Sequence, residues 1–297
     1  MNGLAPASVV VGVDGTPFSD AALAWAVDYA TARNAPLCVV HGAGSLGGDR
    51  IPLRGDARVM LADASRPVTD HAVALVRRQA PGLEVTVHAP FEDPRQALLD
   101  VENASMVVVG TRGRGPVASL LLGSVSLAVV SYARAPVTVV RPPDVSGDPG
   151  AGEVVVGVDV DGSSQVALDL GFEIASMSGR PLVAVHAWPR HDLVYDAMRS
   201  ADRLEAMHQH ESGLAEALAG FGERYPDVPV TSRMSDDGAV AALVKASEQA
   251  AHLVLGSRPA QRIPRYFGSV SRSVVEHAHC PVTVARQPRE HGEEVAG

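Results

Sequence analysis

The stretch that decides the fold is VVVGVDG, Val9–Gly15, because a near copy of it, VVVGVDV, stands at Val154–Val160. The second stretch starts 145 residues after the first (154 − 9). The same offset relates two further pairs of segments: APLCVVH at 35–41 with RPLVAVH at 180–186, and ARAPVTVVR at 133–141 with AHCPVTVAR at 278–286. Three segment pairs with one offset predict an internal duplication in which each copy is a domain.

The join between the copies sets the domain boundaries that we expect. Residues 141–153, RPPDVSGDPGAGE, are rich in Pro, Gly and Asp, a composition typical of linkers. We therefore expect a first domain at 1–141, a linker at 142–152 and a second domain at 153–297. The 297-residue length agrees with two domains, since single cores stop growing near this size.

Short valine-rich runs alternate with longer helical stretches in each copy. After the first run, Ala22, Trp25, Ala26 and Tyr29 have the spacing of one helix face. The second helix is expected within 63–80, with its start near Pro67. Continuous apolar strands that alternate with helices predict a parallel sheet covered on both faces. We expect an α/β chain with two tandem, doubly wound, Rossmann-like domains of five parallel strands each.

The composition excludes several classes of protein. With 25 basic and 34 acidic residues, the net charge is −9, which argues against a general nucleic-acid binder. Apolar runs are strand-sized, and the first residues lack a signal-peptide pattern, so we expect a cytoplasmic protein with no membrane span. Cys38 and Cys280 sit in apolar runs and are interpreted as reduced core thiols, with a disulfide between them as the alternative.

A glycine-rich stretch, GTRGRGPVASLLLGSVS at 110–126, follows the strand SMVVVG. Ligands of open α/β sheets bind beyond the carboxyl ends of the strands, where this loop is expected. Free N–H groups at the start of the next helix form an anion site, to which Arg112 adds charge. The alternative is a plain reversing turn with Ser124 as an ordinary helix cap. The stretch is neither a Walker A motif nor a dinucleotide fingerprint.

The glycine spacing resembles that of a known family. Gly110, Gly113, Gly123 and Ser124 fit the G-x2-G-x9-G-[ST] pattern of nucleotide-binding universal stress proteins. The leading VVVGVDG, the HG after the second strand and the closing APVTVV fit the same family. The resemblance covers nearly the whole chain, once per copy, and looks like the tandem two-domain actinobacterial type with an adenine nucleotide alpha hydrolase-like fold.

The resemblance implies an ATP site in the first copy, with or without Mg²⁺. By analogy, Asp14 contacts the nucleoside and the backbone of Gly42 reaches the adenine. A turn or helix-cap role for Asp14 is the alternative. The positions that match the family's phosphate loop, or line the same pocket, are Gly110, Arg112, Gly113, Gly123, Ser124 and Val125.

The second copy departs from the pattern. Its matching positions are Asp159, Ala187, Gly256, Arg258, Gly268, Ser269 and Val270. Pro259 replaces the middle glycine, and the gap to Gly268 is one residue shorter. Proline removes an N–H donor, whereas Arg258, Arg262 and Arg265 add positive charge, so nucleotide binding in this copy stays open.

The leading functional hypothesis is an ATP-binding regulatory protein of the stress response, whose conformation or assembly depends on the nucleotide. No nucleophile–base constellation stands out, so we expect no catalytic residue and, at most, slow hydrolysis. The alternatives are a weak Mg²⁺-dependent ATPase, a partner-binding module with decayed pockets, and a site for another adenine nucleotide such as cyclic AMP.

Histidines and the last strands carry further expectations. His208 and His210 point to different sides of an amphipathic helix and are interpreted as a solvated face. His41 and His186 are interpreted as structural, so no metal site is expected. The resemblance implies that strands 137–140 and 282–285 pair within one chain. It also implies a homodimer of such chains and an unknown protein partner.

Overall fold

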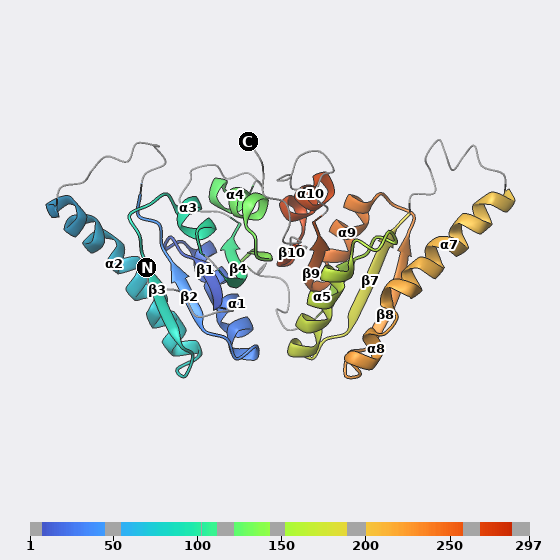
Figure 1. Cartoon of the computed structure of the whole chain (residues 1–297), viewed down its shortest axis with the longest axis horizontal. Helices are drawn as coiled ribbons and strands as arrows, with labels where there is room; N and C mark the ends of the chain where they lie inside the picture. Colours follow the sequence, from blue (N-terminus) through green and yellow to red (C-terminus); the bar gives the residue numbers. More distant parts are fainter. Residues whose placement is uncertain are drawn as a thin grey trace, which may run out of the picture.

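The computed structural model describes residues 8–44, 55–101, 103–111, 122–142, 152–188, 200–257 and 268–286. Strands and helices alternate through both halves of the sequence (Figure 1).

The first copy contains the five strands that the sequence predicts. They are β1 (Ser8–Gly12), β2 (Leu37–Val40), β3 (Val85–His88), β4 (Ala104–Gly110) and β5 (Val137–Val140). The helices between them are α1 (Pro17–Ala32), α2 (Gly55–Gln79), α3 (Pro94–Leu99) and α4 (Ser124–Tyr132).

The second copy repeats this order. Its strands are β6 (Glu153–Gly157), β7 (Leu182–Ala187), β8 (Val230–Ser235), β9 (Ala250–Gly256) and β10 (Val282–Ala285). Its helices are α5 (Gln165–Ser178), α7 (Ser200–Leu218), α8 (Phe221–Arg224), α9 (Ala239–Ser247) and α10 (Ser269–His277).

All ten strands form one sheet in the order β3-β2-β1-β4-β5-β10-β9-β6-β7-β8. Pairing is parallel within each copy and antiparallel where β5 meets β10. The expected pairing of the two last strands inside one chain is therefore confirmed. Figure 1 shows the result as two similar halves joined at the middle of a continuous sheet.

Alternate residues of each central strand enter two different cores. Val9 and Val11 belong to a core that includes buried residues of α1, α2, α5 and α7, whereas Val10 belongs to a core that includes buried residues of α3, α4, α9 and α10. All three valines are fully buried. Helices thus cover both faces of the sheet, which explains why the strands are continuously apolar rather than alternating.

A hydrogen-bonded chain crosses the junction of the two copies. Thr138 and Thr283 are equivalent residues whose hydroxyl oxygens lie 2.7 Å apart. Thr138 donates to Met106 Sδ at 3.1 Å, so Thr283 donates to Thr138 and accepts from His252 Nε2 at 2.7 Å. His252 also stacks on Trp25 of α1, with ring centroids 5.3 Å apart. Buried side chains of both copies are therefore joined by hydrogen bonds at the junction.

Two equivalent arginines tie each copy to the last helix of the other. Arg141 donates to the backbone oxygens of Val275 and Glu276 near the end of α10, at 2.8 and 2.6 Å. Arg286 donates in the same way to the backbone oxygen of Val130 in α4. Carbonyl groups in the last turn of a helix have no intrahelical partner, so these arginines cap helices across the junction.

Two expectations about local structure have clear outcomes. Helix α2 begins at Gly55, so the expected start near Pro67 is wrong. The proline lies inside the helix, where Ser65, Thr69, Ala72 and Val76 form a buried stripe that holds the helix on the sheet. Packing therefore outweighs the single hydrogen bond that proline removes. Both cysteines are buried and free, as expected.

Candidate functional site

Three strand ends of the first copy meet at one edge of the sheet. Strand β1 lies between β2 and β4, and all three run parallel. Their carboxyl ends bring together Asp14, Gly42 and Gly110. The candidate residues of the first copy that the structure describes therefore share the edge where α/β sheets bind ligands.

Asp14 takes part in the turn that starts α1. Its Oδ1 accepts hydrogen bonds from the backbone N–H of Thr16 at 3.0 Å and from the Thr16 hydroxyl at 2.6 Å. Thr16 in turn caps the helix by accepting from Ser19 N–H at 3.3 Å. The alternative turn role of this carboxylate is thus present in the structure. Its expected contact with a nucleoside stays a prediction.

Gly42 is required by a close approach of the chain. A Cβ at this position would lie 2.4 Å from Pro94 Cα, at the start of α3. The next two residues bind the same loop, since Ala43 N–H donates to Pro90 O at 3.2 Å and Gly44 N–H donates to Glu92 O at 2.8 Å. A side chain does not fit here, and the expected contact of the Gly42 backbone with adenine stays a prediction.

Hydrogen bonds bring together the two ends of the glycine loop. Gly123 N–H donates to Thr111 O at 2.7 Å, and the Ser126 hydroxyl donates to Gly110 O at 2.6 Å. A Cβ on Gly110 would lie 2.6 Å from Phe18 O, so this glycine lets α1 pass close to the loop. The end of β4 and the start of α4 therefore form one rigid base for the loop.

The N-cap of α4 is not the residue that the sequence suggests. Gly123 is the N-cap, with φ −62° and ψ 152°, and no side chain caps the helix, so the helix-cap role suggested for Ser124 is wrong. Ser124 is instead the first helical residue and is exposed. Leu127 N–H makes a bond to Gly123 O at 2.8 Å, so earlier N–H groups point beyond the helix end. That end is positive and suits an anion.

The spacing of Val125, Ala128, Val129 and Tyr132 predicts that these residues form the apolar face of α4, and the observed buried face is rotated from it. Ser126, Val129 and Val130 are buried, whereas Tyr132, expected on the apolar face, is 56% exposed. The rotation follows from the bond between Ser126 and Gly110, which turns this small polar side chain inward. Val125, another expected pocket residue, lies half-buried in the first turn.

Several candidate residues lie outside the described part of the chain. Arg112 and Gly113 fall in 112–121, and Arg258, Pro259, Arg262 and Arg265 fall in 258–267. Their roles stay predictions.

The second copy repeats the frame of the site with looser contacts. Gly268 caps α10 with φ −60° and ψ 148°, and the Ser271 hydroxyl donates to Gly256 O at 3.2 Å. A Cβ on Gly256 would meet Ser163 O only at 3.6 Å, an ordinary contact. The end of β9 and the start of α10 are thus arranged like the end of β4 and the start of α4. The close approach of α1 to Gly110 has no equally close counterpart at Gly256.

The remaining candidates of the second copy lie at the same edge. Asp159 donates its backbone N–H to the Ser164 hydroxyl at 2.7 Å, just before α5. Ala187 ends β7 and carries a side chain where the first copy tolerates only Gly42. Ser269 and Val270 occupy the first turn of α10 and are exposed.

His41 and His186 occupy equivalent places and make the same contact. Each has its Nδ1 at 2.8 Å from a backbone oxygen at the end of the neighbouring strand, Val13 O and Val158 O respectively. Since a carbonyl only accepts, each Nδ1 carries the proton. These contacts agree with the structural role that the sequence suggested.

His210 does not lie on a solvated face, so that expectation is wrong for this residue. Its Nδ1 donates to His186 Nε2 at 2.8 Å, and its ring stacks on that of Trp188, with centroids 4.7 Å apart. Burial, together with His186, lowers its pKa. His208 is exposed, as expected. Within the described ranges, no group of three or more His, Cys, Asp or Glu could hold a metal.

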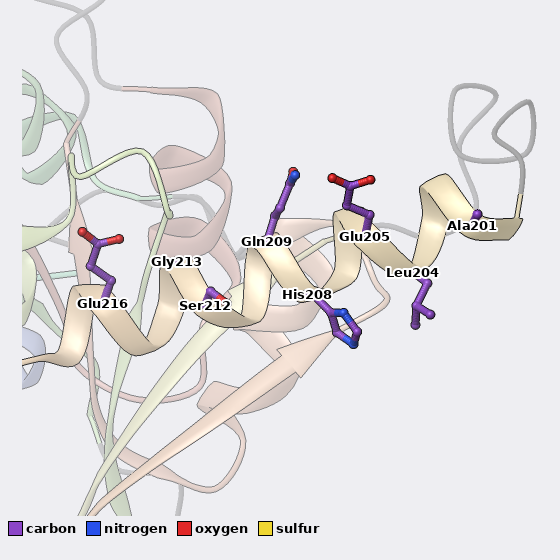
Figure 2. Close-up of a pocket in the computed structure, with 8 residues that line it drawn as sticks. All are labelled: Ala201, Leu204, Glu205, His208, Gln209, Ser212, Gly213 and Glu216. Carbon is purple, nitrogen blue, oxygen red and sulfur yellow. The ribbon is translucent and has the colours of Figure 1, made fainter.

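A separate depression runs along the outer side of α7 (Figure 2). It is lined by Ala201, Leu204, Glu205, His208, Gln209, Ser212, Gly213 and Glu216. All of these belong to one helix, so the depression has no opposite wall to enclose a ligand. It is not part of the candidate site.

Comparison with known proteins decides the family. The model of the universal stress protein family matches residues 7–141 and 151–286. This chain belongs to the universal stress protein family. A universal stress protein of Mycobacterium tuberculosis is 38% identical over 287 residues, covering 94% of this chain and 97% of the relative. Another from the same species is 33% identical over 290 residues, covering 94% and 96%.

Solved structures support the fold of this universal stress protein. A universal stress protein from Archaeoglobus fulgidus superimposes with a TM-score of 0.69 at 20% identity, covering 94% of this chain and 98% of the other. At that identity the likeness shows the fold alone. Among the described helices, none is long and apolar enough to span a membrane.

Proposed function

We propose that this universal stress protein binds an adenine nucleotide, ATP, at the sheet edge of its first copy, and regulates a stress response through the conformation or assembly that binding favours. The observation that carries the proposal is the start of α4. It is capped by glycine without a side-chain acceptor, and it lies beside the end of β4 at a glycine loop. Such a helix end attracts phosphate oxygens.

The other candidates extend the proposed site from the phosphates to the base. Asp14 and Gly42 follow the two neighbouring strands, which suits contacts with the ribose and the adenine. The residues proposed to contact the phosphates, or to line the pocket around them, are Gly110, Arg112, Gly113, Gly123, Ser124 and Val125. Because the described residues contain no carboxylate cluster for a cation, a bound Mg²⁺ would depend mainly on the phosphates.

Nucleotide binding at this site would change a contact at the junction of the two copies. Helix α4 begins at the proposed phosphate site, and its Val130 carbonyl accepts a hydrogen bond from Arg286 of the second copy. A movement of α4 toward bound phosphates would therefore change this contact. Binding that differs between two arrangements of α4 shifts the population between them.

A matched pair of variants tests the proposal. Ser124→Glu and Ser269→Glu each place a carboxylate at the first residue of equivalent helices, α4 and α10. Both serines are exposed and neither caps its helix, so folding is retained, and the carboxylate itself suits the helix dipole. In the first copy that carboxylate competes with phosphate.

The measurement is titration calorimetry of ATP into the full chain. We expect Ser124→Glu to weaken ATP binding about 10-fold or more, the equivalent of ~1.4 kcal/mol, and Ser269→Glu to leave the first site intact. Wild-type protein that binds no ATP, or equal affinity in wild type and Ser124→Glu, would overturn the proposal.

A further inference from the structure

The ten-stranded sheet ends in two edge strands, β3 and β8. In the part of the chain that the structure describes, β3 pairs only with β2 and β8 pairs only with β7. The outer side of each edge therefore presents backbone N–H and C=O groups that another strand can pair with.

The two edges hold equivalent positions but different side chains. Val85 pairs with Leu37 as Val230 pairs with Leu182, which aligns β3 with β8 residue by residue. Val87 is 45% exposed, and its equivalent in β8 is Ser232. The fold places a polar residue there in one copy, so the core does not require the valine in the other.

The loop after β3 shows the same difference. Phe91 is 42% exposed, and its equivalent after β8 is Asp236, which is also exposed. An exposed apolar side chain on an edge strand can pack against a strand that pairs with that edge. Val87 and Phe91 thus have polar equivalents at the second-copy edge, whereas Val230 of that edge is itself 36% exposed.

The sequence of β3 indicates what this edge pairs with. Strand β3 reads VTVH, and the two strands that join the copies read VTVV (β5) and VTVA (β10). Those two pair antiparallel, with Thr138 opposite Thr283 and valines opposite valines. A V-T-V strand is therefore self-complementary in an antiparallel pair, and this chain already uses that property once.

We propose that β3 pairs antiparallel with β3 of a second copy of this chain, centred on Thr86, to form a twofold dimer. In that register Val85 lies opposite the partner's Val87. Glu84 lies opposite the partner's His88, and symmetry makes this contact twice. Cross-strand apolar pairs stabilise a sheet, and an imidazole N–H can donate to a carboxylate. The inference depends on strand edges and is independent of nucleotide binding.

The β8 edge opposes this kind of pairing. It carries Arg233, whose guanidinium lies 3.5 Å from the Glu153 carboxylate, and Asp236 and Asp237 follow the strand. Charged side chains on an edge strand discourage further pairing. A pairing of β3 with β8 of another chain would continue as an open filament, whereas pairing of β3 with itself closes at two chains. The charges on β8 thus favour the closed dimer.

The test measures the mass of the full chain by sedimentation velocity over a wide concentration range. The four-residue strand is short, so the wild type is expected to dimerise reversibly. Val87→Lys puts a charge on the proposed interface, and Ser232→Lys puts the same charge at the equivalent exposed position of β8. We expect at least ~10-fold weaker dimerisation in Val87→Lys and none of that loss in Ser232→Lys. Circular dichroism confirms that both variants fold.

A charge exchange gives a second, independent test. His88→Glu places a carboxylate opposite the partner's Glu84 and is expected to weaken the dimer. The double variant Glu84→Lys/His88→Glu places a lysine opposite the partner's carboxylate in both pairs and is expected to recover the dimer. A wild type that stays monomeric, a dimer that survives Val87→Lys, equal losses in Val87→Lys and Ser232→Lys, or no recovery in the double variant would overturn the proposal.

Discussion

Replacing His252 with methionine is expected to remove part of the acid sensitivity of folding. His252 is fully buried at the junction of the two copies, and burial lowers its pKa from 6.5 to about 3. It donates from Nε2 to Thr283 and stacks on Trp25. The equivalent residue in the first copy is Met106, since Met106 pairs with Val9 as His252 pairs with Val154. Methionine is thus a side chain that this position already accommodates in the other half.

The size of the effect follows from the two pKa values. The unfolded chain binds a proton at this histidine below pH 6.5, whereas the folded chain binds it only near pH 3. The stability that neutral His252 contributes is therefore complete above about pH 6.5 and is lost as the pH falls toward 3. At pH ~5 the pH is about 1.5 units below the unfolded-state pKa. The free energy of unfolding is then lower by about 2 kcal/mol than above pH 6.5. A folded pKa one unit higher leaves this figure almost unchanged.

The assay is urea unfolding of wild type and His252→Met at pH ~7.5 and pH ~5. We expect the wild type to lose about 2 kcal/mol more than the variant between the two pH values. Other groups titrate in both proteins, so their contributions cancel in the comparison. Equal losses in wild type and variant would refute the reasoning, because they would mean that His252 is protonated in the folded protein.

Two further predictions concern the first copy. Gly110→Ala places a Cβ 2.6 Å from Phe18 O and is expected to destabilise folding by about 1–3 kcal/mol, whereas Gly256→Ala meets nothing closer than 3.6 Å and is expected to be nearly neutral. Thermal unfolding of the two variants measures the difference, and equal melting temperatures would contradict it. Burial and Glu173, opposed by Arg33, raise the pKa of Tyr29 to about 12. An alkaline absorbance titration is expected to show a phenol near pH 12 that Tyr29→Phe removes; an unchanged titration would argue against it.

The sequence predicts the architecture well because the duplication repeats every signal. The apolar runs around Val9 and Val154 form strands that are buried on both faces of the sheet. The predicted pairing of strand 137–140 with strand 282–285 is also present. The gathering of Asp14, Gly42 and Gly110 at one edge follows from the parallel strand order. These features depend on hydrophobic patterns that few alternatives can satisfy.

Local details depend on tertiary contacts that the sequence does not display. Ser124 looks like a helix cap, yet Gly123 holds that position because Gly123 N–H and Ser126 both bind the end of β4. His210 looks exposed on an amphipathic helix, yet it contacts His186 at the end of β7 and Trp188 just after that strand. In each case a partner far along the chain decides the local conformation.

The nucleotide content of freshly purified protein tests the central claim most directly. Wild type, Ser124→Glu and Ser269→Glu are denatured, and the released nucleotide is identified by chromatography. Binding at the first-copy edge predicts an adenine nucleotide in wild type and in Ser269→Glu, and its loss in Ser124→Glu. No nucleotide in the wild type, or the same content in Ser124→Glu as in wild type, would contradict it.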